Sequence, residues 1–117
     1  MHNRILAALL VTAATAVTGC ATQKNTHLVY RDATGAPSMQ VDYPNAGFCT
    51  QVEAVAAGNV KCEGVSAASN LAATATLYYD PPGLDVVAHY PNLQTCEKAN
   101  SRMAMGVKLM KRCATKG

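Results

Sequence analysis

The sequence predicts an α+β domain in which two copies of a strand-strand-helix unit form a four-stranded antiparallel sheet with both helices on one face. Three observations predict it. Segments that alternate apolar and polar residues occur in pairs around turn residues, as in β-hairpins. Similar landmarks recur in the same order along the chain, which indicates internal duplication. A set of cysteines in a small domain predicts that the fold is stapled by disulfides.

The duplication is clearest around the tripeptide Tyr-Pro-Asn. This tripeptide stands at 43–45 ahead of Cys49 and again at 90–92 ahead of Cys96, at the same offset. Further matches lie upstream, where 29–35 parallels 77–83, and downstream, where 58–62 parallels 106–113. Agreement at several landmarks in one order predicts pseudo-repeats at about 27–65 and 73–113.

The first unit begins with a hairpin. Residues 27–32 and 39–43 are the predicted strands, and Ala-Thr-Gly-Ala-Pro at 33–37 is the turn. Pro44 ends the second strand because proline has no N–H group for the ladder. Asn45 can then cap a helix over 46–57, with Gly58 as its C-terminal stop.

The second unit begins with a similar hairpin. Residues 73–80 and 84–90 are its predicted strands, with Pro-Pro-Gly at 81–83 as the turn. Successive strand residues point to opposite faces, so Tyr78 and Tyr79 are expected on different faces of the sheet. One of the two rings is therefore expected to face solvent, where it could contact a ligand.

Asn92 is expected to cap the second helix, which packs beside the first over the sheet. Met105 and Leu109 fall off the apolar stripe of this helix, which indicates a break near Gly106 or an exposed contact patch. The stripe itself, whose methionines are expected in the core, consists of Leu93, Cys96, Asn100, Met103, Val107 and Met110.

The N-terminus has the layout of a signal peptide, with one early charge, Arg4, and an apolar run too short to span a bilayer. Residues 17–20, Val-Thr-Gly-Cys, resemble the lipobox of bacterial lipoproteins. The resemblance implies cleavage before Cys20 and a diacylglycerol group on its thiol. The chain is then divided into a signal peptide at 1–19, a lipidated tether at 20–26 and a single small domain at 27–117.

Lipidation at Cys20 places the domain at the cell envelope. Each buried methylene contributes about 0.8 kcal/mol, so two or three acyl chains make release negligible. Ala21 stands where an aspartate would resemble the inner-membrane retention signal, so the outer membrane is expected if the cell has two membranes. The six residues 21–26 reach at most about 20 Å, which keeps the domain near the membrane.

If the Cys20 thiol carries the lipid, four cysteines remain, and this even number predicts two disulfides. Their pairing depends on Gly106. A helix unbroken from Leu93 to Cys113 would place its cysteines about 25 Å apart and force bonds between units. A stop at Gly106 allows bonds within units, which short loops favour. We therefore favour the pairs Cys49 with Cys62 and Cys96 with Cys113.

The sequence has no recognisable catalytic or cofactor motif, and we expect neither enzymatic activity nor a cofactor. Zinc binding by the cysteines is the weaker alternative to disulfides, because neither His27 nor His89 lies at ligand spacing from a cysteine. The one arrangement that could suggest catalysis is a pair of His89 with Asp80 or Asp85 across the second hairpin. A strand histidine beside a loop aspartate is usually only a surface contact.

The net charge of +3 is unevenly distributed. From Leu93 onward six basic residues face one acidic residue, a local charge of +5, whereas residues 20–92 hold three basic and six acidic residues, or −3. The positive charges can complement the dipole of the second helix, or dock on a polyanion such as lipopolysaccharide phosphates or an acidic protein. Nucleic acid is disfavoured by the compartment. The candidate contact residues are Lys98, Arg102, Lys108, Lys111 and Arg112.

These features favour a lipid-anchored accessory lipoprotein with a binding or structural role in the envelope. The alternative is a periplasmic inhibitor of an exogenous enzyme such as lysozyme. That alternative rests on size and location alone, because none of the motif residues of lysozyme-inhibiting lipoproteins is found in this chain.

Overall fold

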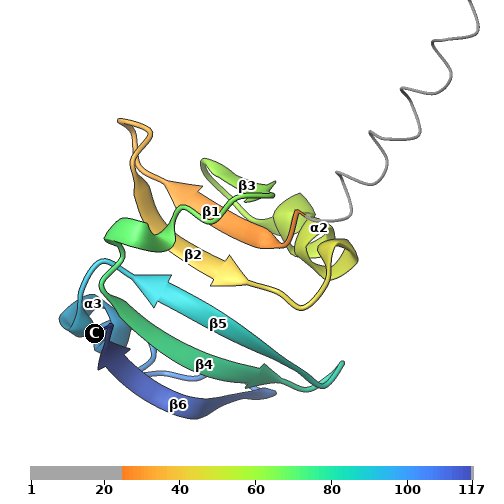
Figure 1. Cartoon of the computed structure of the whole chain (residues 1–117). Coiled ribbons are helices and arrows are strands. Elements are labelled where there is room, and N and C mark those ends of the chain that lie inside the picture. Colours follow the sequence, from red (N-terminus) through yellow and green to blue (C-terminus); the bar gives the residue numbers. More distant parts are fainter. Residues whose placement is uncertain (1–24, 117) are drawn as a thin grey trace, which may run out of the picture.

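A computed structural model describes residues 25–116, in which two units repeat the order strand, strand, helix, strand (Figure 1). The predicted signal peptide, Cys20 and most of the tether lie outside the described residues. The first unit contains β1 (His27–Arg31), β2 (Pro37–Asp42), α2 (Ala46–Val55) and β3 (Val60–Glu63). The second contains β4 (Ala73–Tyr79), β5 (Leu84–Tyr90), α3 (Leu93–Ala99) and β6 (Val107–Thr115).

All six strands form one antiparallel sheet in the order β3-β1-β2-β5-β4-β6. The β2–β5 pair joins the two units at the centre, with Val41 opposite Ala88. The two predicted hairpins are confirmed, but the four-stranded sheet is wrong. Each unit adds a third strand, because the chain that follows its helix returns along the outer side of the first strand.

The second helix is shorter than predicted. It ends at Ala99, and the residues expected to continue it turn back and form β6. Gly106 makes this return possible, because it adopts φ +85° and its carbonyl accepts a hydrogen bond from the Asp80 N–H at 2.8 Å. Met103 and Met110 are consequently 37 % and 57 % exposed rather than part of the core.

Both helices begin where the sequence predicts. The Asn45 side chain accepts a hydrogen bond from the Phe48 N–H, and the Asn92 side chain accepts one from the Thr95 N–H, each at 2.7 Å. Helix α2 ends at Val55, slightly before the predicted end, and Gly58 at φ +93° shapes the turn into β3. The capping asparagines therefore fix the start of each helix directly after the central strands.

The core lies on one face of the sheet, under the two helices. Helix α2 contacts β1 and β3, and α3 contacts β4, β5 and β6, so each helix covers its own half. The predicted disulfides within units are confirmed: Cys49–Cys62 and Cys96–Cys113 tie each helix to the last strand of its unit, with Cα–Cα distances of 6.2 Å and 5.9 Å. The buried residues of this core include Leu28, Val41, Tyr43, Ala75, Leu77, Val86, Ala88 and Tyr90.

The connection between the units, residues 64–72, covers part of the opposite face. It contains the 3-10 helix η1 (Ala68–Asn70), which packs against β2, and Figure 1 shows it crossing that strand. Leu71 is buried in this connection, and Gln40 of β2 is fully buried. The Ala67 N–H donates a hydrogen bond to Gln40 Oε1 at 2.7 Å. The two units are thus joined by a strand pair and by a packed connection.

Candidate functional site

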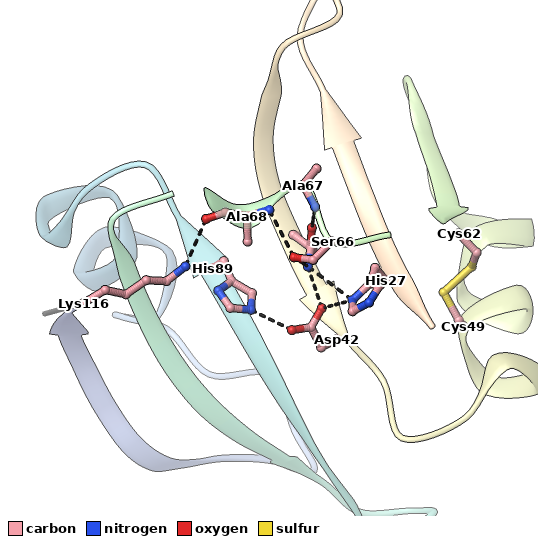
Figure 2. Close-up of polar contacts among 10 residues, drawn as sticks. His27, Asp42, Cys49, Cys62, Ser66, Ala67, Ala68, His89 and Lys116 are labelled. Carbon is pink, nitrogen blue, oxygen red and sulfur yellow. Dashed lines mark hydrogen bonds and ion pairs between the residues drawn. A yellow bond between two sulfur atoms is a disulfide. The ribbon is translucent and has the colours of Figure 1, made fainter. Parts of the chain in front are cut away.

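One polar cluster lies where the two units meet, on the face opposite the helices. Asp42 is the last residue of β2, His27 is its partner on β1, and His89 comes from β5 (Figure 2). His27 Nδ1 lies 2.7 Å from Asp42 Oδ1, and His89 Nε2 lies 2.7 Å from Asp42 Oδ2. Because an ionised carboxylate only accepts hydrogen bonds, both ring nitrogens act as donors.

The Asp42 carboxylate is held in its ionised form. Burial alone raises its pKa, but the hydrogen bonds from His89, His27 and Gln40 outweigh this effect and lower the pKa from 3.8 to about 2. Gln40 Nε2 donates to Asp42 Oδ1 at 2.7 Å and also to Ser66 Oγ at 3.0 Å. The carboxylate therefore connects β1, β2 and β5, and Gln40 links it to the connection between the units.

This cluster has the properties of a structural joint. Nearby, Lys116, just after β6, ties the second unit to the connection by donating to the Ala68 carbonyl at 3.0 Å, as Figure 2 shows. Within residues 25–116, no group of three or more His, Cys, Asp or Glu side chains is arranged to hold a metal ion. Nor is a pocket found in this part of the chain. The Asp42 carboxylate accepts from both histidines and from Gln40, whereas His89 Nδ1 is buried without a hydrogen-bond partner among the described residues.

The sequence alone does not predict this cluster. It suggests Asp80 or Asp85 as the partner of His89, whereas the structure pairs His89 with Asp42. The contact joins residues 47 apart in different units, so only the β2–β5 register brings them together. The alternation of strand residues places Asp42 and His89 on one face, but the choice of which strands pair at the centre had no signal in the sequence.

The five basic residues proposed as a contact surface are divided between two elements. Lys98 lies in the last turn of α3, and Arg102 follows that helix. Lys108, Lys111 and Arg112 lie on β6, so these three residues do not belong to the second helix. These three strand residues are exposed, so their positive charge lies along an edge of the sheet.

The two faces of β6 differ in chemistry. Lys108 pairs with Tyr78 and Lys111 with Thr76, residues that alternate with buried Leu77 and so face away from the helices. Leu109 pairs with Leu77 and lies on the helix side. Positive charge therefore lies on one face of the edge and apolar surface on the other.

Apolar side chains remain exposed along the same edge. Leu109 is 41 % exposed and Met105, in the turn before β6, is fully exposed. This agrees with the expected helix break, and both side chains lie at the surface. Tyr79 packs against the core while Tyr78 lies on the other face, as the strand alternation predicts.

Comparison with protein-family models, curated proteins and solved structures finds no match to this chain. None of the described helices has the length and apolar character needed to cross a membrane. The candidate sites therefore rest on the geometry and chemistry of the residues themselves.

Proposed function

We propose that the protein is a lipid-anchored lipoprotein of the cell envelope that acts as a binding module, without catalytic activity, and that β6 is its contact surface. The lipobox-like sequence at 17–20 supports the anchor. Two disulfides within a small domain support an oxidising compartment outside the cytoplasm. The repeated order of elements and the matching disulfides support an origin by duplication.

The position of β6 supports a protein partner rather than the membrane. The chain enters the domain at β1, and β6 forms the edge four interstrand spacings away, about 19 Å (Figure 1). A tether that ends at β1 holds that side of the sheet near its anchor. The β6 edge then lies on the side of the sheet away from the tether, where a protein partner can reach it.

The exposed chemistry of β6 carries the proposal. A strand that serves only as a sheet edge has no need of exposed large apolar side chains, yet Leu109 and Met110 are exposed between Lys108 and Lys111. Apolar contact area combined with positive charge is typical of a surface that binds an acidic protein partner.

Charge reversal tests the proposal. Lys108→Glu, Lys111→Glu and Arg112→Glu are introduced together, and crosslinking in intact cells measures association with the native neighbour. We expect the crosslinked complex to fall about tenfold or more, because attraction becomes repulsion along the whole edge.

The matched control reverses two basic residues at α3, Lys98→Glu and Arg102→Glu. This variant should retain the complex. Equal amounts of complex in the wild type and the β6 variant would show that β6 is not part of the contact surface. Equal loss in both variants would instead indicate general attraction to positive charge.

A further inference from the structure

The longest strand of the sheet is also an open edge. Strand β6 has nine residues and, in the described part of the chain, a neighbouring strand on one side only. An edge strand presents backbone N–H and C=O groups with which an extended peptide can pair. The disulfide Cys96–Cys113 holds β6 to α3, which keeps this edge in place.

The hydrogen-bond pattern identifies backbone groups that face the open side. The Asp80 N–H donates to the Gly106 carbonyl, so Tyr79 and Val107 form a non-hydrogen-bonded pair. Pairs alternate along an antiparallel ladder, which makes the next pair hydrogen-bonded and the following one, Leu77 with Leu109, non-hydrogen-bonded. The N–H and C=O of Leu109 therefore point away from β4.

The side chains of β6 specify the kind of peptide that fits. Side chains of an added strand lie beside those of β6 on the same faces. Acidic residues on one face would meet Lys108 and Lys111, and apolar residues on the other would meet Leu109. A segment that alternates acidic and apolar residues satisfies both faces.

A second copy of this chain fits poorly. Pairing β6 with another β6 would bring two basic strands together, and like charges across a strand pair are unfavourable. The other edge, β3, has only four residues, and its Glu63 is bound by Arg31 at 2.8 Å.

We propose that an extended segment of a partner protein, alternating acidic and apolar residues, adds to β6 as a seventh strand. This inference rests on the proposed function and specifies the partner and the mode of contact. Backbone hydrogen bonds would supply affinity, and the two faces of the strand would supply specificity.

The test uses the full-length processed protein in detergent micelles and a fluorescent nine-residue peptide that alternates glutamate with valine. The first control peptide has lysine in place of glutamate. The second carries methyl groups on its peptide nitrogens, which keeps the side chains and charges but removes the hydrogen-bond donors. We expect both controls to bind at least about tenfold more weakly than the test peptide.

Two substitutions test the same point on the protein. Leu109→Ala removes the side chain and keeps the outward N–H, whereas Leu109→Pro also removes the N–H at an edge position where proline is tolerated. Thermal unfolding checks that both variants remain folded. We expect L109P to bind the glutamate-valine peptide about tenfold more weakly than L109A.

Equal binding of the methylated and unmethylated peptides, or of L109P and L109A, would overturn strand addition. Failure of the glutamate-valine peptide to bind would also overturn it. These results leave the proposed function standing if crosslinking to a cellular neighbour still depends on Lys108, Lys111 and Arg112. If crosslinking does not depend on these three residues either, the proposal that β6 is the contact surface is contradicted as well.

Discussion

The Asp42 carboxylate lies 2.7 Å from His89 Nε2, and this contact joins the last residue of β2 to β5, the neighbouring strand from the other unit. The same carboxylate accepts from His27 Nδ1 of β1 at 2.7 Å. One ionised group thus links three neighbouring strands across the junction of the two units. The cluster therefore adds side-chain bonds to the β2–β5 ladder that joins the two units.

Asp42→Asn should destabilise the protein. An asparagine presents one oxygen and one NH₂ group, so one of the two histidine hydrogen bonds is lost. Lowering the pKa of Asp42 from 3.8 to about 2 corresponds to about 2 kcal/mol of stability, and we expect a loss of that size in urea unfolding at pH 7. Asp85→Asn is the control, because Asp85 is exposed on the same central strand as His89. Equal stability of D42N and D85N would contradict the structural role.

The contribution of Asp42 should depend on pH. Its pKa is lower in the folded chain than in the unfolded chain, so the unfolded chain binds the proton first as the pH falls. The stabilisation is complete above about pH 4 and disappears between about pH 4 and pH 2. The difference in unfolding free energy between wild type and D42N should shrink over this interval. A difference that stays constant down to pH 2 would contradict the assignment.

Gly106→Ala should destabilise the protein more than Gly35→Ala. Both glycines have positive φ, +85° and +89°, where a Cβ costs about 1–2 kcal/mol. A Cβ at Gly106 would also lie 2.6 Å from the Asp80 carbonyl oxygen, whereas nothing lies within 4 Å at Gly35. Thermal unfolding compares the two. Equal losses would show that the turn before β6 has room to adjust.

The cysteine arrangement was the most reliable guide to the fold. The short loops within each unit correctly predicted both disulfides, and the asparagine caps correctly predicted where both helices begin. The sequence does not predict the third strand of either unit, because Val60–Glu63 is short and because Val107 and Met110 fit the apolar stripe of a helix. Exposure on both faces of β6 blurs the alternation that identifies a half-buried strand.

The site was less predictable than the fold. The sequence indicates the basic residues of the C-terminal region, but its pattern favours a helix for residues that form an edge strand. The Asp42 cluster depends on long-range strand pairing, for which local sequence carries no signal. Local chemistry therefore predicted the types of residue involved, and tertiary pairing decided which of them meet.

Removing either disulfide should cost about 3 kcal/mol, since the bonded cysteines are 13 and 17 residues apart. The pairs are replaced by serine in two separate double variants and compared by urea unfolding. Loss of Cys96–Cys113 should also increase hydrogen exchange in β6, because this bond ties the strand to α3. Loss of Cys49–Cys62 is the matched control, and faster exchange of β6 in that variant alone would show that Cys96–Cys113 does not hold the strand in place.

Cys20→Ser should abolish membrane anchoring, because serine cannot form the thioether that carries the lipid. We expect the variant to lose labelling by radioactive palmitate and to move from the membrane fraction to the soluble fraction. Ala21→Ser is the control and should remain anchored. Membrane retention of unlabelled C20S would show that another part of the chain provides the attachment.

Site-specific photocrosslinking tests the contact surface most directly. A photoreactive amino acid replaces Leu109 on β6 or, as the control, Val55 at the end of α2, which is 84 % exposed. Both variants are expressed in the cells that natively produce the chain and are irradiated intact. A protein adduct of defined mass at position 109, absent at position 55, is the expected result. Equal labelling at both positions, or labelling only at position 55, would contradict the proposal that β6 is the binding edge.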